Sequence, residues 1–150
     1  MLPLIDLGVA AMHAAEYHAP KRNRYVYYPG TTEVPEAAAA PTLAVSFKIL
    51  AEVEFTGNSQ GVIVAQGSRF GGYSLFVKGG KLFYVYNFLG IPPEQRLVVE
   101  APKLGNHIVG VEFVKERITK QLETLGQMTL YVDEEPVAHA PFRTQTGRYI

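Results

Sequence analysis

The sequence predicts a mainly β protein, built as a two-sheet antiparallel β-sandwich. From residue 43 onward, short runs alternate between apolar and polar residues, which is the period of a strand with one buried face. Turns rich in Gly, Asn, Asp or Ser separate these runs. Helical runs do not alternate with the strands as they would around a parallel sheet. Eight or nine such strands favour two packed antiparallel sheets.

The expected organisation is an N-terminal arm followed by one β domain. A chain of 150 residues with 47% hydrophobic residues is long enough for a single domain with a substantial core. We expect residues 1–42 to form the arm and linker, and residues 43–150 to form the sandwich.

The arm combines a helical pattern with a proline-rich linker. In residues 4–18 apolar positions recur at helical spacing, and Pro20 ends the run. Prolines punctuate residues 19–42, which therefore predict a linker. Within it, residues 24–28 have the composition of a strand. The arm is thus expected to be helical in part and extended in part.

The β domain shows a series of strand patterns joined by turn signals. The expected strands span residues 43–55, 62–65, 73–78, 81–87, 97–99, 107–114, 128–132 and 136–139. The sequence Asp133-Glu134-Glu135 provides the turn between the last two strands.

The clearest element is a β-hairpin with Gly79 and Gly80 at its turn. Both central positions of such a turn need a positive φ, which glycine adopts without steric cost. The two-residue turn fixes the register and places Phe76 opposite Phe83. The face expected in the core carries Tyr73, Leu75, Val77, Leu82, Tyr84 and Tyr86, and the other face carries Ser74, Phe76, Lys78, Lys81, Phe83, Val85 and Asn87. Apolar residues on both faces are typical of a central hairpin, whose second face a loop, a ligand or another domain covers in part.

Residues 115–126 break the strand pattern. Ile118, Leu122 and Leu125 recur at helical spacing, and Gly126 suits a helix C-terminus. This stretch predicts either a short surface helix or a long excursion of a hairpin.

Composition excludes several classes of function. The 14 basic residues balance the 14 acidic ones, so no overall charge attracts nucleic acid or anionic lipid. The absence of cysteine excludes disulfides, thiolate metal sites and cysteine nucleophiles. We find no targeting or membrane-spanning pattern and no signal peptide, so we expect no membrane partner and leave the cellular location open.

Reactive groups do not gather in the sequence. The histidines are scattered, and His13 and His18 would not share one face of a helix. Glu52 and Glu54 lie on one strand face, roughly 7 Å apart at Cα. They lack the middle acid of the E-x-D-x-E pattern of jelly-roll glycosidases, and a solvated strand face explains them more simply. We expect no catalytic residue, metal or cofactor in this chain.

The run of residues 21–28 is both basic and aromatic. Such a run could bind single-stranded nucleic acid, although zero net charge argues against that reading. Tyr and Arg are also enriched at protein interfaces, which we favour here over plain local packing.

Three segments resemble one protein family. Residues 22–36 (RNRYVYYPGTTEVPE), 67–72 (GSRFGG) and 80–88 (GKLFYVYNF) resemble the C-terminal region of large bacterial arylsulfatases, which follows the catalytic domain. The similarity extends from about Leu2 to the C-terminus. It implies a jelly-roll sandwich of the concanavalin-A-like or laminin-G-like type. In the family further strands follow the position of Ile150, so we expect the sandwich to be incomplete there, with an open sheet edge that could self-associate.

The resemblance implies an accessory role in a sulfuric ester hydrolase. The formylglycine motif C-x-P-S-R and the metal-binding aspartates of the family are missing, so no family catalytic residue carries over. The implied partner is a sulfatase catalytic domain, in cis or in trans. The residues expected to contact it are Arg22, Arg24, Tyr25, Tyr27, Ser68, Arg69 and Phe70.

Two other functions remain open from the sequence. The first alternative is a carbohydrate-binding module, whose ligand would meet Phe83, Tyr86 and Asn87. The second is a free-standing glycosidase that uses Glu52 and Glu54.

Overall fold

The computed structural model describes residues 22–31, 33–35 and 38–146. The chain falls into two units, Met1–Pro41 and Thr42–Ile150. The helix expected in residues 4–18 lies outside the described residues.

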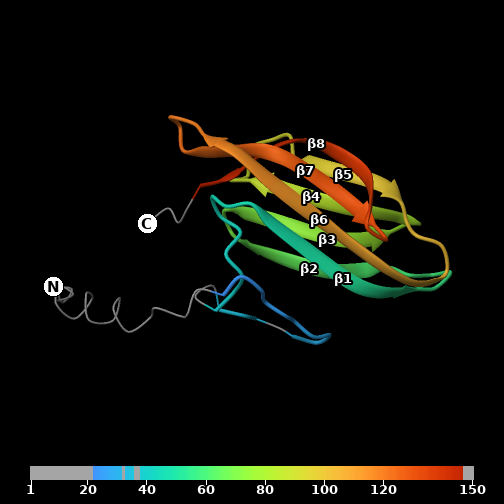
Figure 1. Cartoon of the computed structure of the whole chain (residues 1–150). Coiled ribbons are helices and arrows are strands. Elements are labelled where there is room, and N and C mark those ends of the chain that lie inside the picture. The colour runs from blue at the N-terminus through green and yellow to red at the C-terminus, as the bar shows by residue number, and fades with distance from the viewer. Residues whose placement is uncertain (1–21, 32, 36–37, 147–150) are drawn as a thin grey trace. The chain divides into compact units, whose positions relative to one another are not determined.

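The second unit consists of two four-stranded antiparallel sheets. The strands are β1 (Phe47–Phe55), β2 (Gly61–Ser68), β3 (Gly71–Lys78), β4 (Lys81–Phe88), β5 (Gln95–Glu100), β6 (Gly105–Ile118), β7 (Glu123–Val132) and β8 (Glu135–Gln145). One sheet has the order β1-β6-β7-β8 and the other β2-β3-β4-β5 (Figure 1). The described residues contain no helix. The expected mainly β, two-sheet antiparallel sandwich is confirmed.

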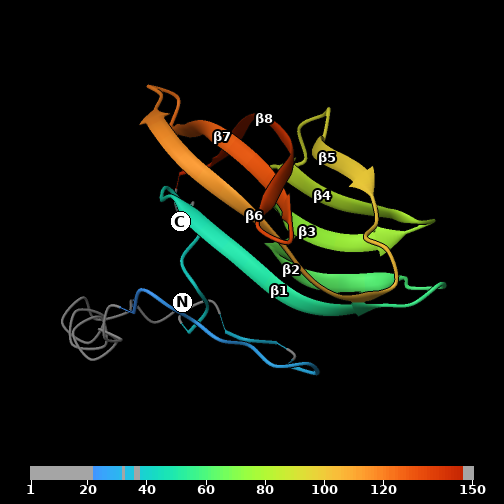
Figure 2. The ribbon, with the colours of Figure 1, turned by 45° about the vertical axis from the view of Figure 1, so that its right-hand side comes forward.

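The chain forms the first strand of one sheet, then all four strands of the other sheet, and then the remaining three strands of the first. After β1 it forms all of β2 to β5 as a meander, and β6 then pairs with β1. Figure 2 shows the two sheets as separate layers. As a result β1 and β8 are the edges of one sheet, and β2 and β5 are the edges of the other.

The core lies between the two layers and follows the alternation of each strand. The fully buried residues include Leu75, Leu82 and Tyr84 from one sheet and Val109, Val111, Phe113, Met128 and Leu130 from the other. Each large apolar side chain buried in this way contributes roughly 1.5–3 kcal/mol. Tyr84 packs at 5.9 Å from Tyr73 and 6.0 Å from Phe142, ring centre to ring centre, so its ring joins both layers.

The hairpin expected around Gly79 and Gly80 is present as β3 and β4. The two glycines have φ of 57° and 74°, as a turn of this type requires. The register is the predicted one, from Lys78 opposite Lys81 to Tyr73 opposite Tyr86. Local turn chemistry therefore determines the centre of this sheet.

Residues 115–126 form strand and turn instead of the helix offered as one reading. β6 continues to Ile118, and β7 begins at Glu123, so the hairpin reading is the right one. Gly126 does not end a helix: it lies within β7, where a Cβ would come within 2.7 Å of the Phe113 ring. The glycine is there to make room for that buried ring.

The first strand is shorter than expected. β1 begins at Phe47 and not at residue 43, because Ala44 has a φ of 60° that no strand accommodates. The N–H of Lys115 donates to Ser46 Oγ at 2.9 Å, and Lys115 Nζ donates to the carbonyl of Ala44 at 2.9 Å. These contacts hold the entry to β1 against β6.

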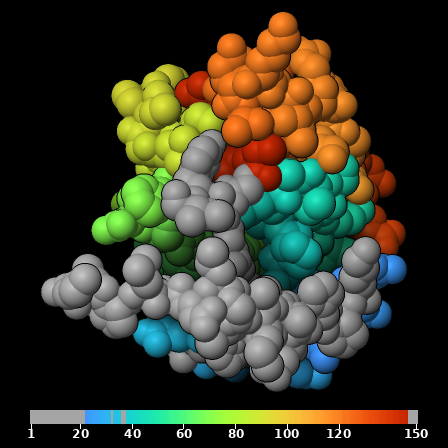
Figure 3. All heavy atoms as spheres, turned by 90° about the vertical axis from the view of Figure 1, so that its left-hand side faces the viewer, coloured from blue at the N-terminus to red at the C-terminus, as the bar shows by residue number. Residues whose placement is uncertain are grey.

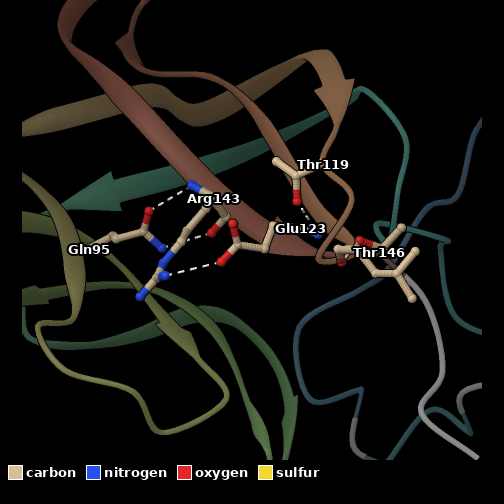
Figure 4. Close-up of polar contacts among 6 residues, drawn as sticks. Gln95, Thr119, Glu123, Arg143 and Thr146 are labelled. Atoms are coloured by element: carbon tan, nitrogen blue, oxygen red, sulfur yellow. Dashed lines mark hydrogen bonds and ion pairs between the residues drawn. The ribbon is translucent and has the colours of Figure 1, made fainter.

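Gln95 on β5 forms two hydrogen bonds to the backbone of β8, at the edge of the other sheet; we call these two bonds the Gln95 clasp. The Gln95 amide donates to the carbonyl of Arg143 at 2.8 Å and accepts from its N–H at 2.7 Å. The Arg143 guanidinium pairs with Glu123 at 3.2 Å and lies 4.5 Å from the centre of the Phe88 ring. Beside this clasp, Thr146 Oγ1 donates to the carbonyl of Leu122 (Figure 4). The opposite layer therefore satisfies the outer backbone groups of β8 at Arg143.

In the first unit, the described residues form loop and turn. Residues 24–28, which have strand composition, are not in a strand. Pro29 and Gly30 form a tight turn in which the Thr31 N–H donates to the carbonyl of Tyr28 at 3.1 Å. The Tyr27 hydroxyl accepts from the Ala40 N–H at 2.8 Å, which ties the two ends of this stretch together.

Candidate interaction surfaces

The arm presents apolar and aromatic side chains to solvent. Val26, Tyr27 and Tyr28 are 58%, 46% and 74% exposed. Of the residues expected at an interface, Arg22 and Arg24 are exposed as well, and Tyr25 is half-buried. Burial of large exposed apolar groups of this kind against a partner stabilises the complex. Val26 and Tyr28 belong to this surface although the sequence did not single them out.

The turn between β2 and β3 forms the second part of the expected interface. Ser68 Oγ accepts from the Phe70 N–H at 3.2 Å, and the Arg69 guanidinium lies 4.7 Å from the centre of the Phe70 ring. The Gln145 side chain donates to the carbonyl of Phe70 at 3.3 Å. Phe70 is nevertheless 53% exposed. This turn is thus held in place by its own contacts while its ring faces solvent.

The seven expected interface residues divide between the two units. Arg22, Arg24, Tyr25 and Tyr27 lie in the first unit, and Ser68, Arg69 and Phe70 lie in the second. Within the second unit, the structure brings Ser68, Arg69 and Phe70 together. Their assembly with the arm into one surface stays a prediction.

The outer face of the β2–β5 sheet carries an apolar row across all four strands. Val62 pairs with Phe76, Phe76 with Phe83, and Phe83 with Val98. The rings of Phe76 and Phe83 are stacked, with centres 4.9 Å apart and planes 2° from parallel. Because the two rings face each other, they form a ridge on the sheet instead of a flat platform.

A hollow of about 580 Å³ lies beside this ridge, over β2, β3 and β4. Its lining includes Phe76, Asn87 and Glu94, and half of its residues are Gly, Ala or Ser. The Asn87 Oδ1 accepts from the Gly90 N–H at 2.7 Å, which leaves the amide Nδ2 as its donor. The hollow can therefore offer an amide donor from Asn87 and the carboxylate of Glu94 among small residues.

The three residues expected at a carbohydrate site do not share one face. Phe83 and Asn87 lie on the outer face, as the alternation of β4 requires. Tyr86 points into the core with 4% exposure, and its hydroxyl accepts from the Gln145 N–H at 3.0 Å. Placing Tyr86 with the other two was wrong, because neighbouring side chains alternate along a strand.

Charged groups on the sandwich form pairs but no cluster of ligands. The acids Glu52 and Glu54 are both exposed on β1. His107 Nδ1 lies 2.6 Å from Asp133 Oδ2, and the Ile108 N–H donates to Asp133 Oδ1 at 3.0 Å. The bond from His107 first, and that from Ile108 second, lower the pKa of Asp133. Within the described ranges, no three His, Asp or Glu side chains are placed to hold a metal ion.

One exposed surface has no counterpart among the predicted sites. The hairpin formed by the end of β6 and the start of β7 carries Val114, Ile118 and Leu122, which are 51%, 45% and 57% exposed. Figure 3 shows the orange atoms of this hairpin at one end of the sandwich, above the teal atoms of β1. The sequence did not indicate this exposed surface, because the helical spacing of Ile118 and Leu122 suggested a helix with one packed face.

Comparison with known proteins gives no match: no family model, curated protein or solved structure is significantly similar to this chain. The resemblance to the arylsulfatase C-terminal region therefore stays a prediction. The part of the chain that the structure describes holds no helix of the length and apolarity needed to cross a membrane.

Proposed function

We propose that this chain is a non-catalytic accessory domain of an arylsulfatase-like sulfuric ester hydrolase, and that it packs on the catalytic domain. The resemblance of residues 22–36, 67–72 and 80–88 suggests the partner. The observation that supports a contact surface is the exposure of Val26, Tyr27 and Tyr28 beside the exposed Arg22 and Arg24. Aromatic residues and arginine are the types that dominate the energy of protein interfaces.

The turn at Arg69 and Phe70 supplies the second contact. The contacts from Ser68 and Gln145 fix its conformation before binding, so little entropy is lost when a partner covers it. Arg69 can form a bidentate pair with a carboxylate of the partner, and Phe70 can fill an apolar pocket.

The test is titration calorimetry of the full chain against a separately expressed catalytic domain of a large bacterial arylsulfatase. We expect saturable binding, and roughly tenfold weaker binding for Arg69→Ala. Arg96→Ala is the matched control, because Arg96 is an exposed arginine on β5, away from the turn. Absence of binding by the unmodified chain contradicts the proposal. Equal affinity for Arg69→Ala removes the turn from the interface.

The second candidate is a carbohydrate-binding module that uses the hollow on the β2–β5 sheet. The hollow favours it because Phe76 and Asn87 line one open space next to Phe83. Sugars need an apolar surface together with a few well-placed amides. The ridge made by the two stacked rings is less suited to a sugar than a flat ring face, which is why this candidate ranks second.

A glycan array tests this candidate. Binding that is lost in Phe83→Ala and kept in Val114→Ala supports it, since Val114 is an exposed apolar residue on β6 of the other sheet and does not line the hollow. An array without any bound glycan rejects it.

A further inference from the structure

We propose that this chain forms a two-fold dimer in which the free edges of two β1 strands pair antiparallel, with Leu50 of each copy at the axis. This inference concerns self-assembly and does not depend on the accessory role. It rests on a difference between β1 and the other three edge strands, and on the order of residues along β1.

The other edge strands carry features that discourage pairing with another chain. β8 contains Pro136 and Pro141, and the side chains of Gln95 and Tyr86 occupy its outer backbone groups. β2 has a bulge between Val62 and Val64. β5 is only six residues long. Each of these features interrupts or shortens the row of backbone groups that a second strand would need.

β1 has none of these features. Its nine residues include no proline, and its register with β6 runs without a shift from Phe47 to Phe55. The side-chain hydrogen bonds nearest to β1 lie beyond its two ends, at Ser46 and Thr56. Its inward positions are all apolar, so no inward charge opposes an added strand. The outer backbone groups of β1 are therefore available as a regular template.

The residues of β1 are complementary to themselves in one antiparallel register. With Leu50 opposite Leu50 of the second copy, Lys48 lies opposite Glu52, and this pair occurs twice. In the single chain Lys48 Nζ lies 4.0 Å from Glu112 and 4.6 Å from the centre of the Tyr131 ring, so it is shared between these groups and Glu52 of the second copy. Leu50 is 57% exposed, so the pairing covers an apolar side chain that the monomer leaves in solvent. On the inner face, Phe47 meets Val53 and Ile49 meets Ala51, which continues the apolar face across the axis. Opposite charges and apolar pairs directly across two strands both stabilise a sheet.

The assembly closes at two copies. A two-fold contact uses the same surface on both partners, so the free edge of β1 is fully paired in the dimer and cannot bind a third copy. The result is one continuous sheet of eight strands, with a protected β8 at each end. This explains how an open edge can serve association without leading to fibres.

A cysteine placed at the axis tests the register directly. The chain has no cysteine, so any disulfide that forms must join the introduced thiols of two copies. Directly opposed residues have Cα atoms about 4.5–5.5 Å apart, within disulfide range. We expect Leu50→Cys to form a covalent dimer under mild oxidation. Glu54→Cys should not, because its two copies lie about eight residues apart along the pair, roughly 27 Å.

Charge reversal supplies the second test. Glu52→Lys places lysine opposite Lys48 at both ends of the pair. We expect roughly tenfold weaker dimerisation by sedimentation. Glu54→Lys makes the same charge change opposite Ser46 and should have a smaller effect. Adding Lys48→Glu to Glu52→Lys restores opposite charges across the axis and should recover part of the lost affinity, because Lys48→Glu also removes the pair with Glu112 in the same chain.

The outcomes decide the proposal. Circular dichroism first confirms that each variant keeps its β spectrum. A chain that sediments as a monomer at every concentration overturns the proposal. So does a dimer whose affinity is the same for Glu52→Lys, or one that is cross-linked equally well at positions 50 and 54.

Discussion

The hydroxyl oxygen of Tyr86 accepts a hydrogen bond from the backbone N–H of Gln145 at 3.0 Å. This contact joins β4 in the centre of one sheet to β8 at the edge of the other. Tyr84, two residues earlier on the same face, is fully buried, and its hydroxyl has no hydrogen-bond partner among residues 22–31, 33–35 and 38–146. Burial, with smaller effects from Tyr73 and Tyr86, raises the pKa of Tyr84 well above the usual value.

These two tyrosines should respond in opposite ways to the loss of the hydroxyl. Tyr86→Phe leaves the Gln145 N–H without this acceptor and should lower the free energy of unfolding by about 1–3 kcal/mol. Tyr84→Phe removes a polar atom that is buried without a partner, so it should leave the stability unchanged or raise it. Urea unfolding of both variants measures the difference. A larger loss for Tyr84→Phe than for Tyr86→Phe contradicts this account of the core.

The Gln95 clasp should contribute measurably to stability. Gln95→Ala removes both bonds to the backbone of Arg143 and should cost about 1–3 kcal/mol, because a part-buried donor and acceptor lose their partners. Gln127→Ala is the control: Gln127 is exposed, and its side chain donates to the exposed Glu116 side chain at 3.0 Å. The control should change stability by no more than about 0.5 kcal/mol. Equal unfolding midpoints for the two variants would show that the clasp is dispensable.

The bond between His107 and Asp133 should make stability depend on pH. The pKa of Asp133 is lower in the folded chain than its usual value of 3.8. The ionised carboxylate therefore stabilises the fold above that value, and this contribution is lost as the pH falls through the lower, folded pKa. Asp133→Asn removes this dependence and suits the turn, where φ is 51°.

Thermal unfolding between pH 6 and pH 2 gives the measurement. We expect the melting temperature of the unmodified chain to fall more steeply below about pH 4 than that of Asp133→Asn. Parallel curves for the two chains would rule out a contribution from this carboxylate.

Gly126 should tolerate no larger residue. A Cβ there would lie 2.2 Å from the carbonyl of Val114 and 2.7 Å from the ring of Phe113, which is fully buried. Gly126→Ala should therefore destabilise the fold by about 1–3 kcal/mol or more. Gly57→Ala is the control, since a Cβ at Gly57 meets no atom within 4 Å. If both variants unfold at the same urea concentration, the packing around Phe113 is looser than described.

Features set by neighbouring residues could be predicted from the sequence. The glycines at 79 and 80 determine the turn, and the turn determines the register of β3 with β4. Alternation then correctly assigns Leu75, Leu82 and Tyr84 to the core. These predictions succeeded because each depends on a few residues in sequence.

Other features depend on residues far apart and left no local pattern. Gln95 and Arg143 are 48 positions apart, and nothing around either residue indicates their contact. The helical spacing of Ile118 and Leu122 is accidental, because the strand there is exposed on both faces and the turn that follows has Leu122 at a φ of 60°. The edge properties of β1 also become visible only once the strand order is known.

The central claim is that this chain binds a sulfatase catalytic domain through residues 22–28 and the turn at residues 68–70. Hydrogen–deuterium exchange of the full chain, with and without that domain, tests it most directly. The account predicts slower exchange in both segments on addition of the catalytic domain. Unchanged exchange in both segments, or protection confined to the strands around the hollow, would contradict it.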